Sequence, residues 1–369
     1  MIILTIVAFI VIFSLLVLVH EWGHFLAARK AGIKVEEFGI GLPPRAKALY
    51  KDKKGTVYSL NWIPFGGYVR LYGEDSSDAK ILKDPKSFAS KSIGKRTLVI
   101  VAGVVMNFLL AWVILTFGFS VGMKPLLVTS EDITKAKEAG IVQVERVLYV
   151  HEVAPDSPAA KAGLKAQDVI AYVNEEPAPT SEDFAKALKK EGNTLSILRN
   201  KEKETIEVTP NEDGRLGVTI STEEFVKDVK EIRYPPHKAA LYSFKEVGRL
   251  SLLTVQMLGK VVTTLVSKFK IPEGVAGPVG IAQMTHSFVQ EGFMALLQFT
   301  ALISISLGVL NIMPFPALDG GRFLFILVEI LLQRRPSPRW EAAIHSVGFA
   351  LLMLLILAVT WNDILHLIR

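Results

Sequence analysis

The sequence predicts a polytopic α-helical membrane protein that carries an inserted soluble α+β domain. Of its 369 residues, 50% are hydrophobic and 21% are charged, and the mean hydropathy of +0.36 is too high for an ordinary soluble enzyme. The hydrophobic residues are concentrated in long uncharged runs, and about 20 consecutive apolar residues suffice for a transmembrane helix. The absence of cysteine excludes disulfide scaffolds, thiol nucleophiles and cysteine-ligated metals, so any metal must be bound by His, Asp or Glu.

Four segments are predicted to span the membrane. The first has only Thr5 and Ser14 as polar interruptions, and it lacks the flanking basic residues and cleavage site of a secretory signal peptide. The second and third contain no charged residue, and the fourth has His345 as its single ionisable residue. The predicted spans are residues 1–19, 97–123, 292–318 and 342–361.

A further apolar segment, 239–269, is interrupted by charged residues. This pattern favours an amphipathic helix that lies on the membrane surface, and a fifth crossing is the alternative. The interrupting residues are Lys245, Glu246, Arg249, Lys260 and Lys268.

The distribution of basic residues predicts the orientation in the membrane. Residues 29–96 contain 15 Lys and Arg against 7 Asp and Glu, whereas residues 124–270 contain 22 of each class. Because cytoplasmic loops are enriched in Lys and Arg, the first loop is expected to be cytoplasmic. Both termini and the inserted domain are then extracytoplasmic.

The inserted domain begins with a change in periodicity. Between residues 147 and 210, short β-type runs alternate with turns, and 181–190 is helix-like. The string SPAAKAGLKAQDVI at 157–170 resembles the core of a PDZ domain, with Gln167 where that pattern usually has Gly. PDZ domains bind extended peptides by adding a strand to a sheet edge. A spacer that binds no ligand is the alternative.

A metal-binding motif, His20-Glu21-Trp22-Gly23-His24, follows the first span. Residues four apart on a helix share one face, so His20 and His24 are close enough to share one metal ion. Imidazole suits Zn²⁺, and Glu21 is placed to act as general base toward a water that the metal activates. Two unrelated interfacial histidines are the alternative, which is disfavoured because ionisable residues at membrane depth are costly and usually functional.

Two histidines leave a catalytic zinc one protein ligand short. Asp319 is the best candidate for the third, because the prolines and glycines of the NIMPFPALDGG segment at 311–321 interrupt the helix and let a carboxylate project sideways. His345 is the main competitor, and an interfacial histidine is the preferred interpretation for it.

Together these motifs resemble the site-2 proteases, a family of intramembrane zinc metalloproteases, and most of all its bacterial RseP/RasP branch, here with one PDZ domain. The resemblance covers nearly the whole chain, with Val104 replacing a usual Pro. The matching segments are HEWGH at 20–24, Gly39-Ile-Gly41, Phe65-Gly-Gly-Tyr68, Gly103-Val-Val-Met-Asn107, Gly277-Pro-Val-Gly-Ile281 and NIMPFPALDGG at 311–321.

The resemblance implies peptide-bond hydrolysis within the plane of a bacterial cytoplasmic (inner) membrane. His20, His24 and Asp319 are expected to bind Zn²⁺, with Glu21 as general base. The expected substrates are single-span membrane proteins such as anti-sigma factors or remnant signal peptides, cut after an upstream site-1 type protease in regulated intramembrane proteolysis. The PDZ-like domain is expected to regulate substrate access, and no nucleic-acid partner is expected.

A substrate helix must unwind before its peptide bonds can be attacked, and the freed backbone groups then need partners. Residues 57–72 are predicted to form a β-hairpin or re-entrant loop whose edge pairs with the unwound substrate. Asn107 and Asn311, both within apolar spans, are expected to bind the substrate backbone. Packing between helices is the alternative for both amides.

The predicted organisation has four parts. They are an N-terminal membrane region at 1–123, a PDZ-like domain at 124–215, an amphipathic juxtamembrane region at 216–290 and a C-terminal membrane region at 291–369. Two other functions compete with the protease: a metal transporter or receptor that uses His20 and His24, and a PDZ scaffold with an inactive protease remnant. Glu21 disfavours the transporter, since transport needs no carboxylate between two ligands.

Overall fold

The computed structural model describes every residue except 1, 75–77, 200–201, 269–274 and 369. Met1 of the first predicted span and Phe269 of the predicted amphipathic segment therefore lie outside the described residues. The chain divides into two compact units. One combines Met1–Met123 with Arg233–Arg369, and the other is Lys124–Ile232.

The first unit is built mainly from long apolar helices. Five helices in the described part of the chain are long and apolar enough to cross a membrane, by length and composition. This supports the predicted class of polytopic membrane protein. The five are α1 (Ile2–Lys30), α3 (Ile93–Val121), α7 (Pro236–Lys268), α9 (Phe293–Ile312) and α11 (Pro338–Ile368).

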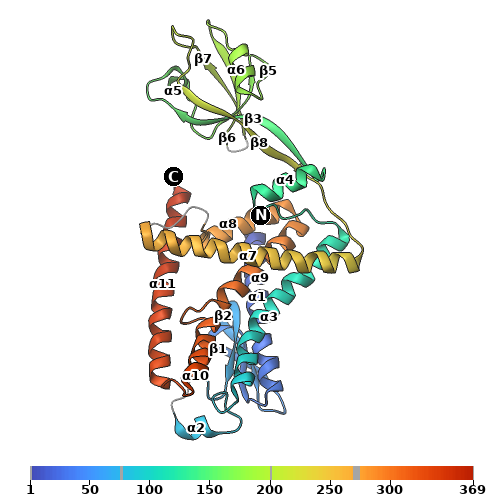
Figure 1. Cartoon of the computed structure of the whole chain (residues 1–369), viewed down its shortest axis with the longest axis vertical. Helices are drawn as coiled ribbons and strands as arrows, with labels where there is room; N and C mark the ends of the chain where they lie inside the picture. The colour runs from blue at the N-terminus through green and yellow to red at the C-terminus, as the bar shows by residue number, and fades with distance from the viewer. Residues whose placement is uncertain (1, 75–77, 200–201, 269–274, 369) are drawn as a thin grey trace. The chain divides into compact units, whose positions relative to one another are not determined.

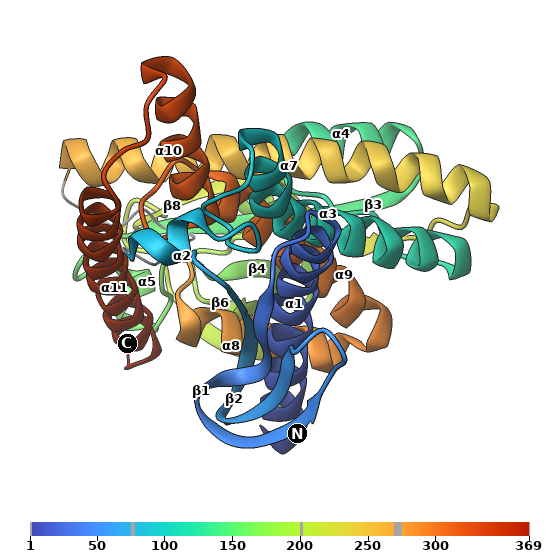
Figure 2. The same cartoon turned by 90° about the horizontal axis from the view of Figure 1, so that it is seen from below.

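Helix α7 differs from α11 in direction. Figures 1 and 2 both show α7 running across the first unit, at a steep angle to α11. Its buried residues, including Ala239, Ser243 and Leu250, recur at helical spacing and form one stripe. Trp112 of α3 donates a hydrogen bond from Nε1 to the carbonyl oxygen of Ala240 at 2.9 Å, which fixes the amino-terminal half of α7. Large apolar side chains such as Leu252 remain exposed on the opposite side.

The predicted span 292–318 ends earlier than expected. Helix α9 stops at Ile312, because Pro314 and Pro316 have no backbone N–H to continue it. A separate helix, α10 (Asp319–Leu332), begins after the intervening loop. Gly320 lets the start of α10 lie close to the end of α9, since a Cβ at this position would lie 2.0 Å from the carbonyl oxygen of Met313.

The first unit, called the membrane unit below, also contains a two-stranded antiparallel sheet. Its strands are β1 (Val35–Lys51) and β2 (Val57–Leu71). Residues 57–72 were predicted to form a β-hairpin or a re-entrant loop. The hairpin is wrong, because these residues form one bent strand whose two halves pair with β1. Both halves of β2 flank the start of β1, so that Gly39 is opposite both Tyr68 and Ser59. The sequence of β1 concealed this strand, because it contains Pro43-Pro44 and several charged residues in place of an alternating apolar pattern.

The buried carboxylate of Glu37 links the two strands of this sheet through hydrogen bonds. Glu37 is 1% exposed, and Arg45 donates a hydrogen bond to it from Nε at 2.7 Å. Burial raises the pKa of the Glu37 carboxyl, but hydrogen bonds lower it more and hold the pKa at about 2. The carboxylate is therefore ionised at neutral pH. The side chains that donate hydrogen bonds to this carboxylate are those of Arg45 and Arg70.

The core of the membrane unit joins the helices to this sheet. Phe25 of α1, Phe38 of β1, Val99 of α3 and Ile326 of α10 belong to one buried cluster. The shorter helices α2 (Ala79–Lys83) and α8 (Pro278–Glu291) complete the unit. Asp363 of α11 accepts a hydrogen bond from the Gly280 amide at 2.8 Å, which satisfies one free N–H of the first turn of α8.

The second unit is an antiparallel sheet in the order β7-β6-β4-β3-β8, with β5 beside β4. It extends to Ile232, beyond the predicted boundary at 215, because β8 pairs with β3 along its whole length. The strands are β3 (Val142–Val153), β4 (Val169–Val173), β5 (Glu176–Pro177), β6 (Asn193–Arg199), β7 (Glu202–Val208) and β8 (Val218–Val229). The helices are α4 (Ser130–Glu138), α5 (Pro158–Lys161) and α6 (Ser181–Ala187).

A buried ion pair stabilises this second unit, and its removal is expected to cost the unit much of its stability. Asp168 is 1% exposed and accepts hydrogen bonds from Arg199 Nε at 2.8 Å and Nη2 at 2.7 Å. Arg199→Met leaves that carboxylate buried and uncompensated, so we expect a loss of about 3–5 kcal/mol. Hydrogen exchange of the unit's amides, measured in the full chain, tests this. Arg146→Met is the control, because the exposed Arg146–Glu224 pair contributes roughly 0–1 kcal/mol.

Candidate metal centre

Helix α1 places two imidazoles one turn apart. His20 and His24 are each 7% exposed, and their Nε2 atoms lie 3.0 Å from each other. The rings meet edge to face, with centroids 4.7 Å apart. Sequence spacing alone predicts this closeness, since residues at i and i+4 lie on one helix face.

A carboxylate from far along the chain completes the cluster. Asp319 is the first residue of α10, and its Oδ2 lies 3.0 Å from Nε2 of His20 and 3.2 Å from Nε2 of His24. Among the described residues, these three form the one cluster of His, Asp and Glu side chains whose ligand atoms lie within 4.8 Å of one another.

Helix α3 orients both rings from the side opposite the cluster. Nδ1 of His24 lies 2.8 Å from the backbone oxygen of Val99, which can only accept, so Nδ1 carries the proton and the Nε2 lone pair of the neutral ring faces the cluster. Nδ1 of His20 lies 3.3 Å from the side-chain amide of Asn107, which is 1% exposed. Metal-bound histidines characteristically donate a hydrogen bond from their second ring nitrogen, as His24 does here to Val99.

Gly103, between these two contacts on α3, leaves the space that the rings occupy. A Cβ at Gly103 would lie 2.4 Å from Nε2 of His24 and 2.8 Å from Cε1 of His20. Gly23 of α1 meets the same helix, since its Cβ would lie 2.4 Å from the backbone oxygen of Ala102. Both glycines belong to the sequence motifs HEWGH and GVVMN, but their role depends on the contact between α1 and α3, which the sequence does not show.

Glu21 is held beside the cluster by the sheet. Its Oε2 accepts a hydrogen bond from the backbone N–H of Val69 in β2 at 3.0 Å. Gly66 and Gly67 of the same strand pack closely against Val17 and Leu18 of α1. The carboxylate therefore keeps a fixed position next to the two histidines.

The remaining predicted residues lie at different distances from the cluster. Nδ2 of Asn311, in the last turn of α9, is 3.5 Å from Nε2 of His20. The amide of Asn107 faces His20, and its backbone oxygen accepts a hydrogen bond from Ser304 of α9 at 2.8 Å. His345 is outside the cluster, because its Nδ1 accepts a hydrogen bond from the backbone N–H of Ala317 at 2.9 Å.

The donor set suits zinc. Two imidazole nitrogens and one carboxylate oxygen converge, and Oδ2 of Asp319 is buried without a hydrogen-bond donor among the described residues. Tetrahedral zinc with ligands at 2.0–2.1 Å separates neighbouring ligand atoms by about 3.4 Å, close to the 3.0–3.2 Å found here. Three protein ligands leave a fourth position open, which is typical of a catalytic site.

The membrane-length helices and the candidate metal centre together indicate the class of the protein, an intramembrane metallopeptidase. The model of Peptidase family M50 matches residues 8–355, so the chain belongs to this family, that of the site-2 proteases, and is a zinc metalloprotease. It is 32% identical over 453 residues to the zinc metalloprotease RasP of Oceanobacillus iheyensis, with 98% of both chains covered.

Two further relatives carry more specific names. The chain is 30% identical to the regulator of sigma-W protease RasP of Bacillus subtilis, again over 98% of both chains. It is 29% identical to the regulator of sigma E protease of Haemophilus influenzae, with the same coverage. The predictions of a zinc metalloprotease and of the family are confirmed.

Proposed function

We propose that the chain cleaves single-span membrane proteins within the bilayer of the bacterial inner membrane, as a step in regulated intramembrane proteolysis. The observation that carries this proposal is the convergence of His20, His24 and Asp319 within a unit of membrane-length apolar helices. Two of the relatives are named regulator of sigma E protease and regulator of sigma-W protease RasP, which supports it. Anti-sigma factors and remnant signal peptides are the substrate classes that we infer, and an upstream protease is the inferred partner.

Zinc bound by His20, His24 and Asp319 supplies Lewis-acid chemistry that activates water and polarises the scissile carbonyl. Glu21 accepts the proton of the attacking water and returns it to the leaving amine. The Val69 N–H, at 3.0 Å, orients the Glu21 carboxylate throughout. The proton on Nδ1 of His24 remains there, because the Val99 oxygen holds it.

We infer that β2 receives the unwound substrate. The segment of β2 around Gly67–Val69 lies at the sheet edge next to α1, and the Glu21 carboxylate is anchored on it. An extended substrate added along this edge gains partners for its backbone and lies beside the metal ligands. The Asn311 amide, 3.5 Å from His20 Nε2, is close enough to the same ligands to contact a substrate carbonyl.

The second unit is the inferred PDZ-like regulator of access. Gln167 has a φ of 75°, the left-handed region in which glycine is favoured, and the PDZ pattern usually has Gly at this position. Among the described residues, strand β8 is the last strand of the sheet, and an edge of this kind is what PDZ domains use to add a peptide strand. The Ser181 N–H of α6 reaches Thr222 of β8 at 3.2 Å, so helix and edge lie side by side.

Deletion of the second unit tests the access role. Replacing residues 124–232 with a short Gly/Ser linker is expected to broaden cleavage to substrates that retain a bulky extracytoplasmic domain. Cleavage of already shortened substrates is expected to stay the same, because the metal ligands are all in the first unit. Paired assays in vesicles measure the ratio of the cleavage rates of the full-length and shortened versions of one substrate. An unchanged ratio would contradict the access role.

The arrangement in the membrane follows the same proposal. We infer four spans, α1, α3, α9 and α11, with α7 on the extracytoplasmic surface. The steep angle between α7 and α11 supports this (Figure 1), as do the charges that interrupt its sequence. The basic loop that contains β1 and β2 is then cytoplasmic, and so is the entry of water to the metal centre.

The overall proposal is tested with the purified full chain in lipid vesicles and a panel of single-span peptides. We expect cleavage inside the span, loss of cleavage on zinc chelation and recovery on zinc addition. Transport of zinc into the vesicles without any peptide cleavage would support the metal transporter instead.

A further inference from the structure

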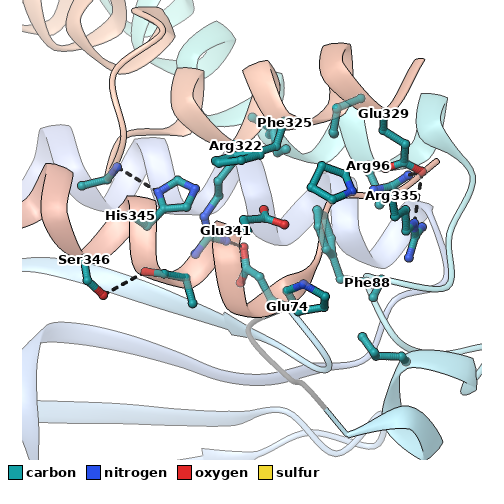
Figure 3. Close-up of a pocket in the computed structure, with 18 of the residues that line it drawn as sticks. Glu74, Phe88, Arg96, Arg322, Phe325, Glu329, Arg335, Glu341, His345 and Ser346 are labelled. Carbon is teal, nitrogen blue, oxygen red and sulfur yellow. Dashed lines mark hydrogen bonds and ion pairs between the residues drawn. The ribbon is translucent and has the colours of Figure 1, made fainter. Parts of the chain in front are cut away.

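A cavity of about 460 Å³ lies between α10, α11, the start of α3 and the segment after β2 (Figure 3). His345 of α11 is part of its wall. Figure 3 shows its ring aimed at the chain segment that precedes α10, where the hydrogen bond to the Ala317 N–H is drawn. The catalytic steps described above use neither His345 nor this wall.

The loop between α9 and α10, residues 313–318, needs contacts from outside itself to hold its conformation. Ala317 has a φ of 81°, which an L-residue other than glycine adopts only at a cost. Two of the six residues are prolines and donate no backbone hydrogen bond. Within the loop, Phe315 donates to Met313 and Leu318 donates to Phe315. The N–H of Ala317 is satisfied from outside the loop, by His345.

The same face of α11 contacts the loop one turn further on. At Gly348, a Cβ would lie 2.3 Å from Cβ of Pro316 and 2.7 Å from its backbone oxygen. The backbone of α11 therefore touches the loop directly. His345 and Gly348 are three residues apart, which puts them on one side of the helix.

We propose that His345 and Gly348 form a seat on α11 that holds the 313–318 loop in the one conformation that carries the Asp319 carboxylate to His20 and His24. Ala317 is two residues from Asp319, so a change of its backbone angles moves the carboxylate directly. His345 is thus a positioning residue: it acts on zinc through the loop, and it is not a ligand. The inference rests on the proposed metal centre.

The hydrogen bond from Ala317 to His345 indicates which variants distinguish a positioning role of His345 from an effect on folding. Nδ1 of His345 is the acceptor, so Asn, whose Oδ1 occupies a similar place, conserves the acceptor, whereas Leu removes it. Ser346→Ala is the matched control on α11, because the Ser346 hydroxyl donates to Ala342 of its own helix at 2.9 Å. Gly348→Ala tests the second contact, and Gly248→Ala, at a helical glycine with open space around it, is its control.

The measurement is the zinc dissociation constant of the full chain, obtained by competition with a chelator, together with the visible spectrum after cobalt substitution. Outer groups that orient a metal ligand typically contribute about 10- to 100-fold to affinity. Because His345 and Gly348 orient Asp319 through the loop, we expect a loss within this range for His345→Leu and Gly348→Ala, with an altered cobalt spectrum. His345→Asn is expected to restore most of the affinity, and both control variants are expected to match the unmodified protein.

Unchanged zinc affinity in His345→Leu would overturn the proposal, and so would a His345→Asn variant as weak as His345→Leu. Asp319→Ala, measured in parallel, separates this outcome from failure of the metal centre. If Asp319→Ala keeps full affinity, the proposed centre is itself wrong. If Asp319→Ala loses zinc while His345→Leu does not, the seat alone is wrong.

Discussion

Glu21→Gln is expected to abolish peptide cleavage while zinc stays bound. The substitution keeps the shape of the side chain and removes the group that accepts a proton from the attacking water. A positioned general base contributes about 10²- to 10⁴-fold to a rate, so kcat should fall by that factor. The proposed zinc ligands are His20, His24 and Asp319, so zinc content per chain should be unchanged.

The measurement combines zinc analysis with a cleavage assay on a single-span peptide in vesicles. Glu131→Gln, an exposed residue of α4 in the second unit, is the matched control and should cleave normally. Cleavage at the unmodified rate in Glu21→Gln would refute the role of general base.

Gly103→Ala is expected to eliminate zinc binding, although it adds only one methyl group. That methyl would lie 2.4 Å from Nε2 of His24 and 2.8 Å from Cε1 of His20, so both imidazoles must move. They have little freedom to do so, since Val99 and Asn107 hold their Nδ1 atoms from the same helix. We expect zinc content to fall below one tenth per chain, and cleavage to fall with it, because misplaced metal ligands cannot share one ion.

Gly94→Ala provides the control on the same helix, α3, since a Cβ there meets nothing within 4 Å. Replacing an unhindered helical glycine by Ala usually stabilises a helix by about 0.5–1 kcal/mol. Gly94→Ala should thus keep zinc and activity, and helix content by circular dichroism should be equal in both variants. Full zinc occupancy in Gly103→Ala would mean that the rings and α3 are less closely packed than the distances indicate.

Part of this site follows from the sequence alone. The i, i+4 spacing of His20 and His24 sets their proximity through helix geometry, without any tertiary information. The prolines of the 311–321 segment predict a break in the helix, and α9 does end at Ile312. The start of α10 could not be placed from the sequence, because it depends on the close approach of Gly320 to the carbonyl oxygen of Met313.

Contacts between distant segments explain what the sequence left open. Strand β1 was missed, since its stability comes from the bonds of Arg45 and Arg70 to Glu37 and from pairing on both sides, and an alternating apolar pattern is absent. His345 was considered as a metal ligand, but its bond to Ala317 exists only when α11 packs on the loop.

The C-terminal boundary of the second unit also depends on pairing between distant segments. Strand β8 reads as a charged stretch and is identified only by its pairing with β3. The boundary at 232 follows from that pairing, as does the correction of the predicted boundary at 215.

The central claim is that one zinc ion is bound jointly by two neighbouring imidazoles and a carboxylate from the start of α10. Zinc affinity of Asp319→Ala in the full-length protein tests it most directly. We expect a loss that exceeds the roughly 10- to 100-fold typical of an outer partner, since a direct ligand is removed. An Asp319→Ala protein that binds zinc as tightly as the unmodified chain would contradict it.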